Sequence, residues 1–306
     1  MVAKTRFQRD TGLQARMGLT IFLLGLLYVI FVAILLSIGI ATGLVLVIAA
    51  AILFVQYFFS DKIALFGMGG RLVTEAEAPE LYQVIQRLCT LADMPMPKVA
   101  IANTDIPNAF ATGRNPKNAV VCVTAGLMRR LEKPEVEAVL AHELSHVAHR
   151  DVAVMTIASF LGMVAGLLTR LAFYATWFTG GDREGNNQNT AMIEIGIMVV
   201  SAVVYAISFV LIRALSRYRE LAADRSGAIL IGRPALLKSA LIKITGEMGR
   251  IPTKDIRSAS AFNAFYFTPA IKPNQISIGS IFSTHPSLEK RLAQLDELER
   301  QLGTAE

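Results

Sequence analysis

The sequence predicts a membrane α-helical protein with four transmembrane helices and an α+β domain on one side of the bilayer. Composition is the first observation: the 306 residues are 53% hydrophobic and 18% charged, whereas soluble domains are roughly 45–50% apolar and about 25% charged. The mean hydropathy of +0.48 agrees with this. The second observation is patterning, because the apolar residues gather in long uncharged segments that are separated by two hydrophilic blocks.

Residues 17–60 contain the first two predicted spans. They carry no charged side chain, and one span needs about 20 residues, so the segment holds two helices joined by a turn near Ser37–Gly43. A cleavable signal peptide has an apolar core of only about 7–15 residues, so we expect a retained anchor. Basic residues dominate the segment 1–16 in front of it, which is therefore expected to be cytoplasmic.

Residues 152–212 contain the third and fourth predicted spans, joined by the polar, turn-rich residues 179–190, which we expect to form an external loop. Arg170 and Glu194 stand at similar heights near the external ends of these spans, about 28 Å from the cytoplasmic boundary. They are expected either to reach the membrane interface independently or to form an ion pair.

Both hydrophilic blocks, residues 61–151 and 213–306, are predicted to lie in the cytoplasm. An even number of spans precedes each block, and basic residues gather directly after the fourth span, while acidic residues outnumber basic ones in the external loop. The two cysteines, Cys89 and Cys122, are expected to be free thiols in this reducing compartment. The net charge of +6 is thus interpreted as a topology signal, with the lipid bilayer and not nucleic acid as partner. No oligomeric state follows from the sequence.

The first block is predicted to have α+β structure. An amphipathic helix is expected at Ala78–Ala92, where Pro79 stands at the start, and a second helix from Pro134 to about Arg150. Between them lie three β-like runs, the last two joined by a hairpin-type connection at residues 114–117. These runs are Lys98–Asn103, Asn108–Gly113 and Asn118–Thr124.

The second block is predicted to be mostly helical, so that the whole domain has more helix than sheet. Its helices are expected at Arg213–Ile231, Pro234–Met248 and Pro286–Leu302. Residues 251–283 are rich in Pro, Ser and Asn and are predicted to form an irregular loop.

Three of the four histidines lie in the segment AHELSHVAH, residues 141–149. His142-Glu143-x-x-His146 is the pattern of zinc proteases, because residues i and i+4 share one helix face and two imidazoles can reach one ion. Glu143 would lie close enough to accept a proton from water at that ion. His149 falls on the same face and is interpreted as a polar residue at the membrane interface, with a role as accessory ligand as the alternative.

A catalytic zinc site also needs a third protein ligand and one position that stays open to water. The metzincin pattern would place a histidine where the chain has Val152, so that class is excluded. Glu220 is the next candidate. If the helices of His146 and Glu220 leave the membrane as an antiparallel pair, the two residues stand about 9 and 12 Å beyond their spans and so at similar height.

The same count places Asp224 beside His142. The two residues lie about 18 and 15 Å beyond the spans, so Asp224 is predicted to accept the second N–H of His142 and to orient its ring, as carboxylates around zinc sites commonly do. Two independent helix counts thus predict one metal centre with His142, His146 and Glu220 as its ligands.

Together with the predicted spans, four motifs resemble the HtpX family of bacterial integral-membrane zinc metalloproteases, which are relatives of the CAAX prenyl proteases. The resemblance covers nearly the whole chain. The motifs are His142-Glu-x-x-His146, Glu220-x-x-x-Asp224, Asn108-Ala-Phe110 and Thr284-His-Pro-Ser287. The resemblance implies a zincin-like metalloprotease domain with one Zn²⁺ per chain, held by His142, His146 and Glu220, and with Glu143 as general base.

By the same resemblance, the protein would be a multi-pass protein of the bacterial cytoplasmic (inner) membrane that cleaves misfolded or damaged membrane proteins at the cytoplasmic face during stress. His285 would stabilise the developing oxyanion, although it also suits an ordinary helix start before Pro286. The strand with Asn108, Ala109 and Phe110 would bind extended substrate through main-chain hydrogen bonds, although it also suits an ordinary sheet.

Three other functions compete with this interpretation. An enzyme with its zinc inside the bilayer is disfavoured because charged residues such as Glu135 and Asp151 flank the motif and are costly in hydrocarbon. A CAAX-type prenyl-peptide protease is disfavoured because that class usually has more spans. A non-catalytic membrane scaffold with a structural metal is disfavoured because structural zinc usually takes cysteine ligands, and both cysteines lie outside the motif.

Overall fold

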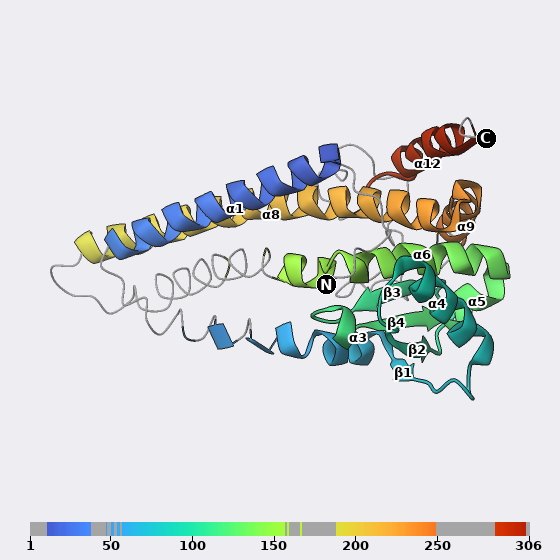
Figure 1. Ribbon diagram of the computed structural model, residues 1–306. Helices are drawn as coiled ribbons and strands as arrows, with labels where there is room; N and C mark the ends of the chain where they lie inside the picture. Colours follow the sequence, from blue (N-terminus) through green and yellow to red (C-terminus); the bar gives the residue numbers. More distant parts are fainter. Residues whose placement is uncertain are drawn as a thin grey trace.

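The computed structural model describes most of the chain: residues 11–37, 57–156, 188–248 and 285–303, with some helical positions at 47–55, 158 and 166. The helices and strands form two parts, an arm of long helices and an α+β domain at one end of this arm (Figure 1).

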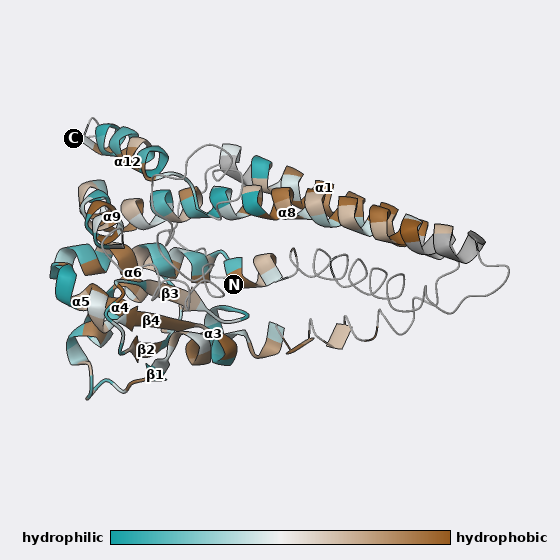
Figure 2. Cartoon of the chain, turned by 180° about the vertical axis from the view of Figure 1, so that it is seen from behind, coloured by the Kyte–Doolittle hydropathy of each residue, from teal (hydrophilic) through white to brown (hydrophobic). Residues whose placement is uncertain are grey.

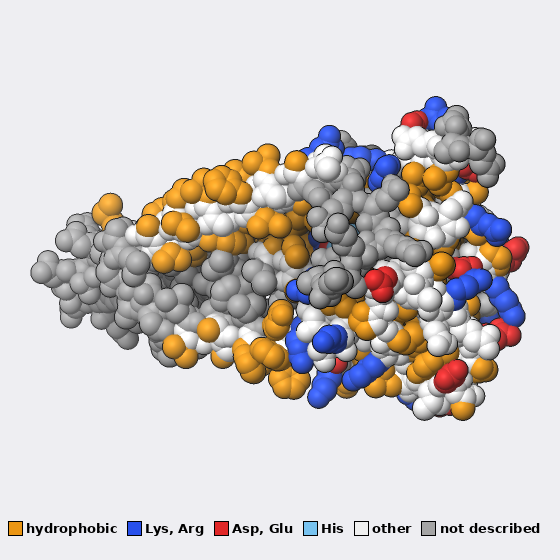
Figure 3. All heavy atoms as spheres, in the orientation of Figure 1, with side chains coloured by type: hydrophobic (Ala, Val, Ile, Leu, Met, Phe, Trp, Pro, Cys, Tyr) orange, Lys and Arg blue, Asp and Glu red, His pale blue; other side chains and the backbone are white. Residues whose placement is uncertain are grey.

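Helices α1 (Thr11–Ser37) and α8 (Gln188–Ile231) lie side by side along the arm (Figure 1). Each contains an apolar window that is long enough to cross a membrane, within Ala15–Ile34 in α1 and within Ile195–Ile231 in α8. Their outward side chains are largely hydrophobic, as the brown ribbon of Figure 2 and the orange side chains of Figure 3 show. These segments agree with the first and the fourth predicted spans.

Several predictions fall outside the described residues. They concern the turn near Ser37–Gly43, most of the second and third spans, the external loop 179–190, the side chains of Arg170 and Glu194, and the loop 251–283. The arrangement with four spans and the cytoplasmic location therefore stay predictions.

A four-stranded sheet in the order β1-β2-β4-β3 forms the centre of the α+β domain. Strands β2 and β4 are parallel, and the two outer strands pair antiparallel with their neighbours. The strands are β1 (Gly70–Leu72), β2 (Lys98–Ala102), β3 (Ala109–Thr112) and β4 (Val120–Thr124). The three predicted β-like runs and the hairpin are confirmed, and a short 3₁₀ helix, η1 (Pro116–Asn118), lies in the hairpin connection. The sequence did not predict β1.

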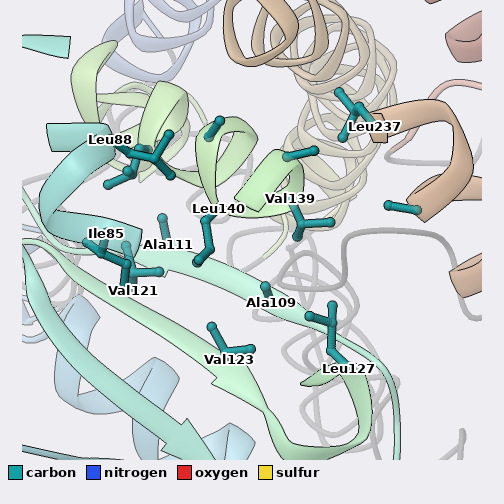
Figure 4. Close-up of a cluster of buried hydrophobic side chains, with 14 of the residues drawn as sticks. Ile85, Leu88, Ala109, Ala111, Val121, Val123, Leu127, Val139, Leu140 and Leu237 are labelled. Carbon is teal, nitrogen blue, oxygen red and sulfur yellow. The ribbon is translucent and has the colours of Figure 1, made fainter. Parts of the chain in front are cut away.

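Side chains alternate across the sheet, so that each face has its own core. Helices α4 (Pro79–Ala92) and α6 (Lys133–Ala148) cover one face, and α3 (Ser60–Met68) covers the other. Figure 4 shows the first core, between the sheet and α6. It includes Ile85, Leu88, Ala109, Ala111, Val121, Val123 and Leu140. The second core contains Phe110 and Ala64.

The remaining helices complete the domain around α6. Helix α5 (Ala125–Arg130) follows β4, α9 (Pro234–Met248) packs against α6, and α12 (Leu288–Gly303) packs against α9 and α8. The predicted helices of the first and second blocks are confirmed with small shifts at their ends, whereas α3 and α5 are additions that the sequence did not predict.

Helix α6 carries the HExxH motif and differs from its prediction at one end. It begins with a capping box between Glu132 and Glu135, and Pro134 lies in its first turn. The sequence predicts that the helix runs to about Arg150, and the helix count assumes that it continues into the third span. Instead α6 ends at Ala148, Arg150 has a left-handed φ of 57°, and helical backbone resumes at Asp151. The helix is therefore broken just behind the motif.

Helix α8, by contrast, is uninterrupted over its 44 residues and joins the predicted fourth span to the predicted helix Arg213–Ile231. Gly227 lies where α8 crosses α6. A Cβ at this position would come within 2.8 Å of the backbone nitrogen of His142, so only glycine permits so close an approach. This packing brings Glu220 and Asp224 of α8 to the HExxH motif of α6.

Candidate metal centre

Three side chains from two helices converge on one point. Helix α6 provides His142 and His146, and α8 provides Glu220; all three are buried, with exposed fractions of 1%, 8% and 8%. The two histidine Nε2 atoms lie 3.1 Å apart, and Glu220 oxygens lie 3.7 Å from His142 Nε2 and 3.4 Å from His146 Nε2. Among the described residues, these three form the group that could hold a metal ion.

The separations between the donor atoms fit a zinc ion. Zn–N and Zn–O bonds are about 2.1 Å long, so the ligand atoms of a tetrahedral site lie about 3.4 Å apart. The two Nε2 atoms are 3.1 Å apart, and each lies at a similar distance from one Glu220 oxygen: His146 is 3.4 Å from Oε1 and His142 is 3.7 Å from Oε2. Two histidines with one glutamate are also the ligands of one known class of catalytic zinc site. The structure thus brings together the three ligands that the sequence predicted.

A carboxylate lies next to the Nδ1 atom of each of the two ligand histidines. Nδ1 of His142 lies 2.9 Å from Asp224 Oδ1, and Nδ1 of His146 lies 2.6 Å from Asp151 Oδ2. An Nδ1–H directed at a carboxylate leaves the Nε2 lone pair for a metal. Asp224 lies where the helix count placed it. Asp151 was not predicted, because in an unbroken helix it would point about 140° away from His146; the break at Arg150 turns it back.

Each of these carboxylates is in turn paired with a buried arginine. Arg291 donates from Nε and Nη2 to the two oxygens of Asp224, at 2.7 and 2.6 Å, and Arg219 Nε lies 3.1 Å from Asp151 Oδ1. Burial alone would raise the carboxyl pKa values. The arginine and histidine partners outweigh it, holding the pKa of Asp224 below its usual range and lowering that of Asp151 to about 2. Both carboxylates are therefore ionised acceptors for the imidazoles.

Glu143 lies beside the three ligands and is 4% exposed. Its Oε2 accepts a hydrogen bond from the backbone N–H of Ala111 in β3, at 2.9 Å. Burial is the main cause that raises the pKa of Glu143 to about 8 in the chain without a bound ion. The side chain is thus a buried carboxyl group that is fixed between α6 and the edge of the sheet.

Strand β3 is the edge strand next to the site, and its two sides differ. The carbonyl of Asn108 accepts a backbone N–H from β4, so the main-chain groups of Asn108, and of Phe110 two residues later, point toward β4. Those of Ala109 and Ala111 point away from β4, and Ala111 contacts Glu143. Of the three predicted substrate-binding residues, Ala109 alone has main-chain groups on this outer side. The ring of Phe110 is buried on the α3 face.

The last two histidines lie at different distances from the metal site. His285 is 5% exposed, and its Nδ1 lies 3.1 Å from Glu220 Oε2, so it belongs to the site although α12 begins only at Leu288. His149 is not part of the group of metal donors; its Nδ1 lies 3.2 Å from Ser145 Oγ.

The fold and this site define a metallopeptidase, a hydrolase of peptide bonds, with an HExxH helix and a third donor from the neighbouring helix. Comparison with known proteins agrees. Residues 75–299 match Peptidase family M48, and the chain belongs to this family.

Named relatives extend the match to nearly the whole chain. Protease HtpX homolog 1 of Streptomyces coelicolor is 60% identical over 302 residues, which are 99% of this chain and 98% of the relative. Protease HtpX homolog of Moorella thermoacetica is 53% identical over 96% of each chain, and Protease HtpX homolog 2 of Methanosarcina acetivorans is 48% identical over 98% of this chain and 100% of the relative. The resemblance to the HtpX family is thereby confirmed.

A solved structure supports the fold alone. The crystal structure of S. mikatae Ste24p matches with a TM-score of 0.54 at 18% identity, over 94% of this chain and 67% of that chain. The similarity therefore includes the arm as well as the α+β domain.

Proposed function

We propose that the protein is a membrane-bound, zinc-dependent endopeptidase that cleaves misfolded or damaged membrane proteins at the cytoplasmic face. The observation that carries the proposal is the convergence of His142, His146 and Glu220, with donor separations of 3.1–3.7 Å, next to the buried carboxyl of Glu143. The apolar segments of α1 and α8 support the membrane location. The bacterial inner membrane and the role in stress follow from the resemblance.

Each of the residues around the site would have its own role in peptide hydrolysis. When bound, a zinc ion supplies a Lewis acid that polarises the scissile carbonyl and makes water more acidic. Glu143 accepts a proton from the attacking water and passes it to the leaving amine. The N–H of Ala111 holds this carboxyl in place, and His285 donates a hydrogen bond to the oxyanion that develops on the substrate. Asp224 and Asp151 keep the two imidazoles oriented.

An extended substrate would pair with the outer side of β3. Ala109 directs its N–H and carbonyl to this side and Ala111 its carbonyl, while the Ala111 N–H is taken by Glu143, so the substrate adds as a further strand next to Glu143. Binding through main-chain groups depends little on the side chains of the substrate, which suits a protease that cleaves misfolded chains.

Metal removal tests the proposed function. We expect a chelator to abolish cleavage of an unfolded membrane protein by the purified chain, and about one equivalent of Zn²⁺ per chain to restore it, because three protein donors bind one ion. Metal content and cleavage rate are measured on the same samples. Full activity in metal-free protein would contradict the proposal. Faster cleavage of a prenylated peptide than of the unfolded protein would favour the CAAX-type alternative, and metal binding without any cleavage would favour a scaffold.

The proposed topology makes a separate prediction. A reporter inserted at Gly185 should behave as external and one fused after Glu306 as cytoplasmic, because three spans precede Gly185 and four precede Glu306 in the proposed arrangement. Enzymatic reporters that work on only one side of the membrane provide the measurement. The reverse pattern, or both reporters on one side, would contradict the four-span topology.

A further inference from the structure

Helix α3 has an apolar stripe on its outer face that the core of the domain does not use. Phe59 directly before the helix, Ile63 and Phe66 follow one another at i, i+4 and i+7, and they are 41%, 44% and 92% exposed. The opposite face of the same helix packs on the sheet through Ala64, which is fully buried. Large side chains so exposed at helical spacing mark a binding surface, and α3 is apolar on both faces.

Basic side chains lie next to this stripe. The Lys62 ammonium lies 5.3 Å from the ring centroid of Phe59, and the Arg114 guanidinium lies 5.1 Å from that of Phe58. Arg114 comes from the β3–β4 connection, which also carries the exposed Lys117. Asp61 is the only acidic residue of α3 itself. Aromatic rings beside cations on one face are typical of segments that lie at a membrane surface rich in anionic lipid.

The position of α3 in the molecule fits such a surface. The helix follows directly on the apolar residues 17–60 in the sequence. In Figure 1 it lies where the α+β domain meets the arm, at the level at which α1 begins. Figure 3 shows hydrophobic and basic side chains gathered at this junction.

We propose that α3 is an interfacial anchor: Phe59, Ile63 and Phe66 lie in the boundary between headgroups and acyl chains, and Lys62 and Arg114 bind phosphate groups of anionic phospholipids. The proposal rests on the membrane location given above. It commits to lipid because the stripe continues from an apolar segment and because its flanking charges are mainly basic.

The anchor would set the height of the active site above the bilayer. Thr112 of β3 donates its hydroxyl hydrogen to the carbonyl of Ser60, at 3.3 Å, and Arg114 donates to the carbonyl of Phe58, at 3.4 Å. Strand β3 is therefore tied to α3 at one end, and it contacts Glu143 through Ala111. A fixed α3 holds the substrate-pairing edge at one distance from the membrane.

Tryptophan reporters in the full chain test this placement. The single native tryptophan, Trp177, is replaced by Phe, and Phe66→Trp is introduced in protein reconstituted into vesicles that contain phosphatidylglycerol. Phe22→Trp, at a 65% exposed position of α1, reports the span, and Leu91→Trp, at a 39% exposed position of α4, reports the aqueous side. Quenching by brominated lipid and by aqueous acrylamide is measured for each.

We expect brominated lipid to quench both Phe22→Trp and Phe66→Trp, and the acrylamide quenching constant of Phe66→Trp to be at least about two-fold below that of Leu91→Trp. If Phe22→Trp is quenched by lipid but Phe66→Trp behaves like Leu91→Trp, the anchor is wrong and the membrane location stands. If Phe22→Trp is not quenched either, the membrane location itself fails. Protection of Phe66→Trp that arises in detergent and grows with protein concentration would mark a contact between two copies of the chain and overturn the anchor.

The role of the charges is tested in the same protein. Replacing phosphatidylglycerol by phosphatidylcholine should weaken the protection of Phe66→Trp from acrylamide, and the pair Lys62→Gln and Arg114→Gln should remove this dependence on lipid charge. Lys98→Gln, at an exposed position of β2, is the matched control and should leave the dependence unchanged. If Phe66→Trp is equally protected from acrylamide in both lipids while Lys62 and Arg114 are kept, these two residues do not bind the phosphate groups.

Discussion

Glu143→Gln should lower the turnover of an unfolded substrate by about 10²–10⁴-fold, the usual contribution of a general base, while the zinc content stays near one per chain. Glutamine has nearly the same shape and can still accept the N–H of Ala111, so the position between α6 and β3 is kept. It cannot take up the proton of the attacking water. Turnover and metal content, measured together, separate this chemical defect from loss of the site.

Glu137→Gln is the matched control for this substitution. Glu137 lies on the same helix and pairs with Arg87 away from the metal donors, so its variant should keep both activity and metal. If Glu143→Gln lost its zinc, Glu143 would have to be a metal ligand. If it retained full turnover, another group would have to be the base.

Arg291→Met should lower the free energy of unfolding by about 3–5 kcal/mol, the usual cost of removing one partner from a buried ion pair. Arg291 is 1% exposed and makes two hydrogen bonds to Asp224, which is fully buried. Its loss leaves a buried carboxylate without its main counter-charge. Because Asp224 in turn orients His142, zinc affinity should also fall, by about 10–100-fold.

Thermal unfolding in detergent and competition with a zinc chelator measure the two effects. The midpoint should fall by roughly 5–8 °C, since an unfolding entropy of about 2.1 cal/mol/K per residue makes 1 kcal/mol worth about 1.6 °C in a chain of 306 residues. Arg300→Met is the control, because Arg300 lies on the same helix with a side chain that is 74% exposed and paired with Glu297. A surface pair of this kind contributes about 0–1 kcal/mol. Equal midpoints for the two variants would contradict a stabilising role of Arg291.

Local signals in the sequence predicted most elements of the α+β domain. Helices α4 and α9 begin at prolines and lie where the sequence placed them, because proline suits the first turn of a helix. The runs of β3 and β4 were predicted with their hairpin. The ligands of the metal site were predicted because each lies on a helix, and residue spacing along a helix is regular enough to compare heights on two of them.

Features that depend on distant partners could not be predicted in this way. Nothing in the sequence places the strands in the order β1-β2-β4-β3, because pairing is decided between segments that are far apart. Arg291 lies far along the chain from Asp224, and Arg219 equally far from Asp151, so neither pair shows in local spacing. The break at Arg150 involves no glycine or proline, the residues that usually signal one.

The continuity of α8 has a consequence for chain length. Between the apolar segment that begins at Ile195 and the metal donor Glu220 there is no loop that could absorb an extra residue. One inserted residue in this stretch would turn Glu220 by about 100° about the helix axis and shift it by about 1.5 Å, away from His142 and His146. Changes in length within this stretch of α8 should therefore cost the metal site its third donor, however similar the inserted residue is to its neighbours.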